Sequence, residues 1–174
     1  TPSYLYLPGC LEALLRHSPE VALVVMLRSP GDRMVSHYGH ERRLGVERRS
    51  PLVAFLLERR RLRRSTDPLA VDSAQRHASY RDRSRYSQQL EHLASLTDRY
   101  HVVLLDDLRA RPDVALAGIY RFLGIPAQSV EHVPRLNAGD GKEPRIARAI
   151  ARVMTRREGR TIERMLGVPP GSLR

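Results

Sequence analysis

The 174-residue chain contains no tryptophan, and aromatic residues make up only 5% of it. Its core must therefore consist mainly of aliphatic side chains. The single cysteine, Cys10, excludes an internal disulfide bond and a cysteine-based zinc cluster. We expect Cys10 to be a small buried residue. The longest apolar run, about residues 21–27, is far too short to cross a membrane.

Lysine is also nearly absent. Of the 30 Lys and Arg residues, Lys142 is the only lysine and the other 29 are arginine, and the net charge is +11. This balance favours anionic partners, such as nucleic acids, membrane surfaces and small molecules that carry phosphate or sulfate. Arginine clusters at 42–43, 48–49 and 59–64 predict either solvated helix faces or a surface that gathers an anionic acceptor.

The apolar pattern predicts two strands and about six helices. Residues 21–27 form a continuous apolar, β-branched run, which is typical of a strand buried on both faces in a parallel sheet. A second such run covers residues 101–105. The polar stretch 65–79 predicts a long loop. Apolar spacing and helix-breaking residues predict helices near 11–15, from 30 onward, and at 50–64, 86–97, 112–123 and 146–154.

The last predicted helix has the clearest amphipathic pattern. We expect its inward face to carry the apolar residues at i, i+3, i+4, i+7 and i+8, which are Ile146, Ala149, Ile150, Val153 and Met154.

Two parallel strands are too few for a stable sheet. With no internal repeat and no low-complexity linker, we expect residues 1–174 to be one α/β domain whose remaining strands precede Thr1. The chain would then be the C-terminal portion of that domain.

Chemically useful side chains gather where the first strand ends. Arg28 follows the apolar run, and Ser29-Pro30-Gly31-Asp32 predicts a helix start with a serine cap and a proline in the first turn. Ligands of open α/β sheets bind at the carboxyl ends of strands. Arg28 and Ser36, two turns into the helix, would together suit a terminal phosphate. The alternative is that Arg28 pairs with Asp32 and that Ser36 has no special role.

This segment, Arg28-Ser-Pro-x-Asp-Arg-x-x-Ser-His-Tyr38, resembles the 3′-phosphate-binding segment of the sulfotransferases that use 3′-phosphoadenosine 5′-phosphosulfate (PAPS). The resemblance implies that Arg28 and Ser36 bind the 3′-phosphate of the nucleotide. It also implies the parallel-sheet, P-loop-NTPase-like α/β fold of that family, within its bacterial and carbohydrate-modifying branch.

Further segments resemble the family in the same order along the chain. Tyr86, in Arg-Tyr-Ser-Gln-Gln-Leu, matches a Tyr-x-x-x-Leu helix whose tyrosine lies beside the adenine. Residues 102–108 match a strand that ends in acidic residues. Residues 122–125 match a Phe-Leu-Gly helix end, and residues 1–4 match a Thr-Pro-x-Tyr element. In the glycine-rich stretch 137–145, Lys142 and Arg145 are candidates for a loop that closes over the phosphate, and a solvated turn is the alternative.

The chain also departs from the family. It has no counterpart of the 5′-phosphosulfate loop with its lysine, and no identifiable acid/base residue, so we expect both before Thr1 and assign no catalytic residue. The resemblance implies transfer of a sulfuryl group from PAPS, with adenosine 3′,5′-bisphosphate (PAP) as product and without a metal. The acceptor would be a hydroxyl or amine of a glycan, glycolipid or secondary metabolite. We expect a cytoplasmic enzyme without membrane insertion and without a nucleic-acid partner, although an upstream anchor remains open, as does the oligomeric state.

Two other classes of function are weighed against this one. An arginine-rich nucleic-acid-binding module would use the basic clusters, but the buried strands and the scarcity of aromatic residues argue against it. A phosphotransferase related to nucleotide kinases would share the sheet architecture.

As for other sites, His37 and His40 predict a surface pair rather than a metal site. Asp106 and Asp107 are adjacent, so their side chains point apart and do not predict a catalytic pair.

Overall fold

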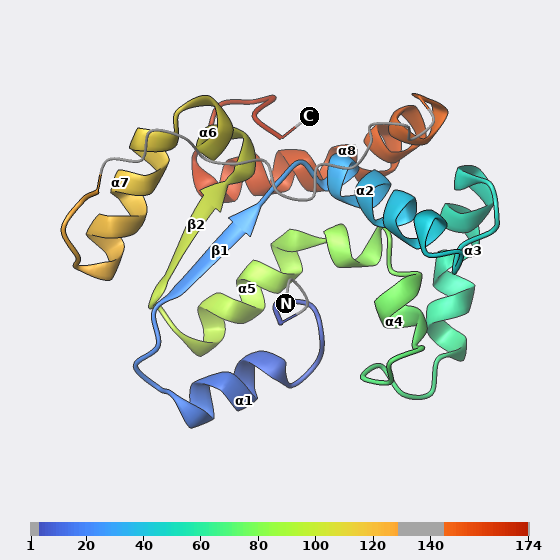
Figure 1. Ribbon diagram of the computed structural model, residues 1–174, viewed down its shortest axis with the longest axis horizontal. Coiled ribbons are helices and arrows are strands. Elements are labelled where there is room, and N and C mark those ends of the chain that lie inside the picture. Colours follow the sequence, from blue (N-terminus) through green and yellow to red (C-terminus); the bar gives the residue numbers. More distant parts are fainter. Residues whose placement is uncertain (1–3, 129–144, 174) are drawn as a thin grey trace.

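The computed structural model describes residues 4–128 and 145–173, which form a mixed α/β fold with a two-stranded parallel sheet (Figure 1). The strands are β1 (Leu23–Leu27) and β2 (Tyr100–Leu104). The helices are α1 (Cys10–His17), α2 (Pro30–Arg43), α3 (Pro51–Arg64), α4 (Ala74–His77), α5 (Tyr86–Leu96), α6 (Leu105–Ala110), α7 (Pro112–Leu123) and α8 (Arg145–Leu166), with a 3-10 turn, η1 (Asp82–Ser84).

The two strands pair in parallel from Leu23 opposite Tyr100 to Leu27 opposite Leu104, so both carboxyl ends lie at the same edge of the sheet. Both strands were predicted from the sequence. The prediction that the first is buried on both faces is wrong, because Val24 is 40% and Met26 50% exposed. Alternate residues of a strand point to opposite faces, and the apolar cluster over β1 contains the other set.

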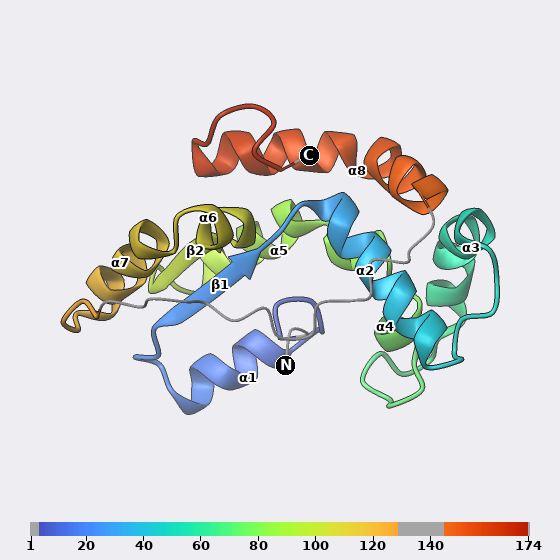
Figure 2. The same ribbon diagram turned by 45° about the horizontal axis from the view of Figure 1, so that its top comes forward.

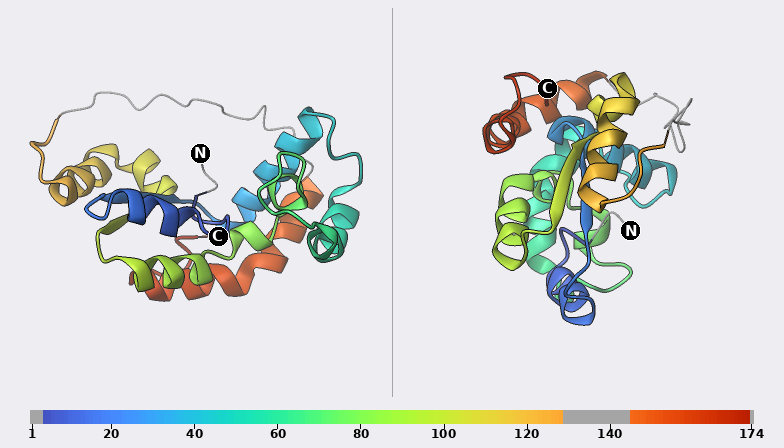
Figure 3. Two further views of the ribbon diagram at one scale, coloured as in Figure 1. Left: turned by 90° about the horizontal axis from the view of Figure 1, so that it is seen from below. Right: turned by 90° about the vertical axis from the view of Figure 1, so that its left-hand side faces the viewer.

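Helices cover the sheet unequally. Leucines of α1 and α5 and Ile162 of α8 pack on the face of the sheet that carries Leu27 and Leu104. On the opposite side, α7 contacts β2 (Figure 3). His101 of β2 stacks on Phe122 of α7 with ring centroids 5.5 Å apart. A second apolar cluster joins α2, α3 and α8 around Tyr38, Phe55 and Tyr80. The fold thus has two adjoining cores.

The last helix, α8, lies along one side of the molecule and crosses α2 (Figure 2). Its predicted inward face is partly wrong, since Ile146 is 63% and Val153 79% exposed, whereas Ala147 and Ala151 are fully buried. The crossing is close: a methyl group added at Gly31 of α2 would lie 3.3 Å from the Thr155 hydroxyl. Small side chains therefore occupy the contact with α2, and Ile146 and Val153 face outward.

Three further expectations need correction. A short helix, α4, lies within the predicted loop 65–79, and α6 follows β2 directly. Cys10, expected to be buried, is only half-buried at the start of α1.

Among the helices described by the structure, none has the length and apolar character needed to span a membrane.

Candidate functional site

Arg28 connects the carboxyl end of β1 to the start of α2. The helix begins as predicted, with Pro30 in the first turn and the Ser29 hydroxyl accepting a hydrogen bond from the Asp32 N–H at 3.4 Å. The Arg28 side chain extends along α2, where its Nη2 donates to the Arg33 carbonyl at 3.5 Å. The guanidinium group is thereby held beside the second turn of the helix.

Ser36 lies one helical turn beyond the carbonyl that Arg28 contacts. It is half-buried on the same side of α2 as the exposed residues Asp32 and His40, which are four residues away in either direction. Within the described part of the chain, the Ser36 hydroxyl takes part in no side-chain hydrogen bond. The alternative interpretation, an ion pair between Arg28 and Asp32, is not formed, although the Asp32 charge still favours the Arg28 cation. Arg28 therefore has no carboxylate partner, and the Ser36 hydroxyl has no side-chain hydrogen bond, in the described part of the chain.

The structure brings Tyr86 to Arg28, although 57 residues separate them in the chain. Tyr86 is the first residue of α5 and is 7% exposed. Burial raises the pKa of its hydroxyl, and the charges of Arg33 and Arg28 oppose this rise. The ring belongs to the apolar cluster over the sheet. Tyr86 therefore supports the guanidinium groups from within the core.

Three arginines near this point have no carboxylate partner at ion-pair distance in the described part of the chain: Arg28, Arg33 and Arg83, which we call the Arg28 cluster. Arg33 donates to the carbonyls of Ser79 at 3.2 Å and Tyr80 at 3.1 Å. Burial lowers its pKa to about 9, so it stays a cation at neutral pH. Burial also lowers the pKa of Arg28 and Arg83. Such desolvated, unpaired cations favour binding of an anion.

Arg83 differs from its neighbours in this cluster because one of its nitrogens is buried without a partner. Its Nη2 donates to the Gln75 carbonyl at 2.6 Å, and its guanidinium carbon lies 4.9 Å from the ring centroid of Tyr6. The Nε atom makes no hydrogen bond. Arg83 therefore adds positive charge behind Arg33, but its own side chain is buried.

Arg49 and Arg61, in contrast, share a buried carboxylate partner. Glu47, whose side chain is 0% exposed, pairs with Arg61 and Arg49 and accepts a hydrogen bond from the Tyr80 hydroxyl at 2.8 Å. Burial opposes ionisation of Glu47, but the Arg49 N–H, Arg61 and the Tyr80 hydroxyl lower its pKa to about 2. We call this group the Glu47 network. It joins the segment before α3 to the end of that helix.

Sequence reasoning missed the side chains that hold the segment between Ser79 and Ser87. Glu58 of α3 accepts hydrogen bonds from the N–H groups of Arg81 at 2.8 Å and Asp82 at 2.7 Å, and burial raises its pKa to about 7. Glu158 of α8 accepts from the Ser87 N–H at 2.7 Å. Arg33 of α2 holds the same segment through its hydrogen bonds to the carbonyls of Ser79 and Tyr80. No local pattern marks these residues, because their partners lie 23 to 71 residues away.

The predicted late loop is only partly described. Lys142 lies outside the described residues. Arg145 is the exposed first residue of α8, and the α8 atoms nearest Gly31 belong to Ala151, Arg152 and Thr155, two turns further on. The structure therefore does not bring Arg145 to Arg28, and a role for either residue in closing over a phosphate stays a prediction.

His37 and His40 do not form the predicted surface pair. His37 is 8% exposed, and burial lowers its pKa to about 4. Its Nε2 lies 2.9 Å from the Arg76 carbonyl and 3.4 Å from Glu41, so it joins α2 to α4. Only His40 is exposed. Nowhere in residues 4–128 and 145–173 do three or more potential metal ligands gather.

The two acidic residues after β2 also have separate partners. Asp106 lies 3.4 Å from Arg109, and Asp107 lies 3.3 Å from Arg111. The two carboxylates thus pair with different arginines.

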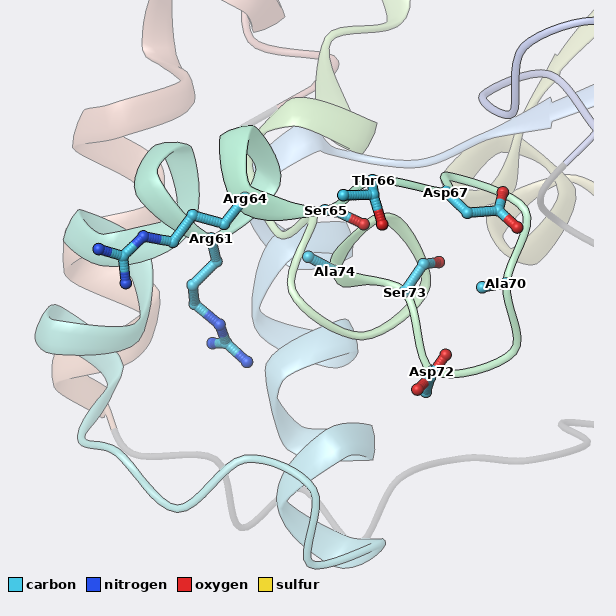
Figure 4. Close-up of a pocket in the computed structure, with 9 residues that line it drawn as sticks. All are labelled: Arg61, Arg64, Ser65, Thr66, Asp67, Ala70, Asp72, Ser73 and Ala74. Carbon is cyan, nitrogen blue, oxygen red and sulfur yellow. The ribbon is translucent and has the colours of Figure 1, made fainter.

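Two hollows in the described surface lie away from Arg28, Ser36 and Tyr86. One, of about 370 Å³, lies between the end of α3 and residues 65–74 (Figure 4). Arg61 in this hollow belongs to the Glu47 network, and Asp67 and Asp72 add negative charge. The other, of about 280 Å³, lies between β2, α7 and the end of α8. In the first hollow, Asp67 and Asp72 offset the charges of Arg61 and Arg64, and in the second, Arg111 pairs with Asp107.

Comparison with known proteins gives a structural match but no sequence match. No family model matches the chain, and no curated protein matches it in sequence. The chain is similar in structure to a sulfotransferase from Alicyclobacillus acidocaldarius, with a TM-score of 0.73 and 21% sequence identity. The match covers 98% of this chain and 64% of that one, so the chain spans less than two thirds of the length of this structural relative. At this identity the likeness concerns the fold.

Proposed function

We propose that this chain carries the nucleotide-binding part of an enzyme that transfers a sulfuryl group from PAPS to an acceptor hydroxyl or amine. The observation that carries the proposal is the Arg28 cluster. Arg28 lies at the carboxyl end of β1, and all three cations lack carboxylate partners in the described part of the chain. The likeness in fold to a sulfotransferase supports the same conclusion, and with it a P-loop-NTPase-like sheet in the whole enzyme.

Each residue has a distinct role in this proposal. Arg28 binds the 3′-phosphate through its guanidinium group, and Ser36 donates a hydrogen bond from its free hydroxyl to the same phosphate. Tyr86 positions Arg28 from the core, since its burial leaves little of the ring accessible to a nucleotide. Arg33 raises the local positive potential. The nucleotide supplies the sulfuryl group, and the side chains named here bind and orient it.

The proposal assigns binding roles only. The base that deprotonates the acceptor and the groups that stabilise the departing phosphate are not assigned to residues of this chain. The acceptor is proposed no more narrowly than a glycan, glycolipid or secondary metabolite.

Calorimetric titration tests the proposal. We expect PAP to bind in the micromolar range and 5′-AMP to bind at least about tenfold more weakly, because AMP lacks the 3′-phosphate. Equal affinities, or no binding of either nucleotide, would contradict the assignment of Arg28 and Ser36. Preference for ATP with magnesium over PAP would instead favour a phosphotransferase. The exposed Arg99, which pairs with Glu20, provides a control substitution, Arg99→Ala.

A further inference from the structure

The outward face of α8 carries all seven arginines of the helix and no exposed carboxylate. The helix is 22 residues long, or about 33 Å. Its arginines are exposed at Arg145, Arg148, Arg152, Arg156, Arg157, Arg160 and Arg164. Its two acidic residues face the protein instead: Glu158 accepts from the Ser87 N–H, and Glu163 accepts from the N–H groups of Gly171 and Leu173. This face is therefore strongly and uniformly positive.

Aliphatic side chains are exposed among these arginines. Ile146, Ala149 and Val153 fall at i, i+3 and i+7, so they share one side of the helix. Val153 is 79% and Ile146 63% exposed. Arg156 lies one turn beyond Val153, and Arg160 two turns beyond it. The outward side of α8 thus combines exposed aliphatic residues in its first half with arginines along its whole length.

We propose that this face of α8 is a docking surface for an anionic lipid bilayer. Arginine supplies the charge complementarity, because Arg152, Arg156 and Arg160 make no side-chain ion pair or hydrogen bond within the described residues. The exposed aliphatic residues would enter the boundary between headgroups and acyl chains, as the apolar side of an interfacial helix does. The helix lies lengthwise on an outer side of the molecule, where a flat surface can reach it (Figure 2).

A bilayer fits these observations better than a nucleic acid does. Phosphates of either partner would satisfy the arginines, but a nucleic acid gains little from exposed Ile and Val. Surfaces that bind single-stranded nucleic acids also use aromatic residues for stacking, and α8 contains none. The surface is distinct from the nucleotide site, so its test does not depend on the proposed function.

The absence of tryptophan from the chain makes a direct experiment possible. The Val153→Trp variant places a single reporter on this face, and the Val71→Trp variant places one at an equally open position, 81% exposed, in the loop before α4. Fluorescence is recorded with vesicles of phosphatidylcholine alone and with about one third phosphatidylglycerol added. We expect a blue shift only for the tryptophan at position 153 and only with the anionic vesicles.

A charge-reversal variant gives a second readout by vesicle co-sedimentation. Arg156→Glu combined with Arg160→Glu should weaken binding to the anionic vesicles at least about tenfold, since each surface arginine contributes to attraction. Arg99→Glu combined with Arg121→Glu changes the net charge equally at other exposed positions and should have little effect. Equal loss in both double variants, binding without a fluorescence shift, or binding to duplex DNA but not to vesicles would each overturn the proposal.

Discussion

The Glu47 network and the Arg28 cluster are both built on arginines, but they differ in which groups face the guanidinium groups. Glu47 supplies a fully buried carboxylate to Arg61 and Arg49. Arg28 and Arg33 are faced by backbone carbonyls and by the Tyr86 hydroxyl instead. The first arrangement is complete without a ligand. The second leaves net positive charge in a poorly solvated place, which a bound anion would neutralise. In a chain with 29 arginines, the partner of each one therefore separates structural arginines from candidate binding residues.

The largest effect is expected from breaking the complete network. Glu47→Ala should lower the free energy of unfolding by about 3–5 kcal/mol, because Arg61 and the buried Tyr80 hydroxyl lose their partner. Denaturant unfolding measures this value. Glu20→Ala is the matched control, since the pair of Glu20 with Arg99 is exposed and should contribute no more than about 1 kcal/mol. Similar losses in the two variants would remove the distinction between buried and exposed pairs.

Arg28→Ala should weaken ligand binding more than it lowers stability, in contrast to Glu47→Ala. We expect a loss of about 1.5–3 kcal/mol in PAP binding, or roughly ten- to a hundredfold in Kd, because a charge-assisted contact is removed. Stability should change much less than in Glu47→Ala, since Arg28 has no carboxylate partner to strand in the described part of the chain. Calorimetry measures the change in PAP affinity, and denaturant unfolding of the same sample measures the change in stability. Unchanged PAP affinity in Arg28→Ala would remove Arg28 from the proposed site.

Two buried groups should make stability nearly independent of pH between about 4.5 and 6.5. His37 has its pKa lowered from 6.5 to about 4, so the unfolded chain gains a proton first and stability falls on acidification through this window. Glu58 has its pKa raised from 4.5 to about 7, so stability falls as pH rises through the same window. Each contribution is at most about 1.4 kcal/mol per pH unit.

Glu58→Gln separates the two contributions. Without the carboxyl group, the His37 contribution is no longer opposed, and the free energy of unfolding should decline steadily from pH 6.5 toward 4.5. The His37→Asn variant should show the reverse slope. Unfolding midpoints measured across this range test both variants. Parallel pH profiles in wild type and both variants would show that neither group titrates with folding.

The smallest effect is expected at Ser36. Ser36→Ala should weaken PAP binding by about 0.5–1.5 kcal/mol, the usual contribution of one hydrogen bond. It should leave stability unchanged, because the hydroxyl makes no side-chain hydrogen bond in the described part of the protein. His40→Ala, on the same side of α2, is the control. A loss of stability without a loss of affinity would give Ser36 a structural role.

Much of the secondary structure could be predicted because its signals are local. The Ser29-Pro30 start of α2 and the Gly124 end of α7, where φ is 67°, depend on a few adjacent residues. Both strands and the approach of Arg28 to the carboxyl end of the sheet followed from apolar runs. The short helices α4 and α6 were missed because neither is long enough to show an apolar period.

The sequence alone determined the two strands, the main helices, the basic character of the chain and the choice of Arg28 and Ser36 as candidates. Only the tertiary structure decided which arginines have carboxylate partners, that Tyr86 supports Arg28 from the core, and that α8 turns Ala147 and Ala151 inward. Helix and strand signals depend on neighbours along the chain. Pairing, burial and helix crossing depend on residues tens of positions apart, and one arginine or one apolar stripe looks like another until the fold brings its partners together.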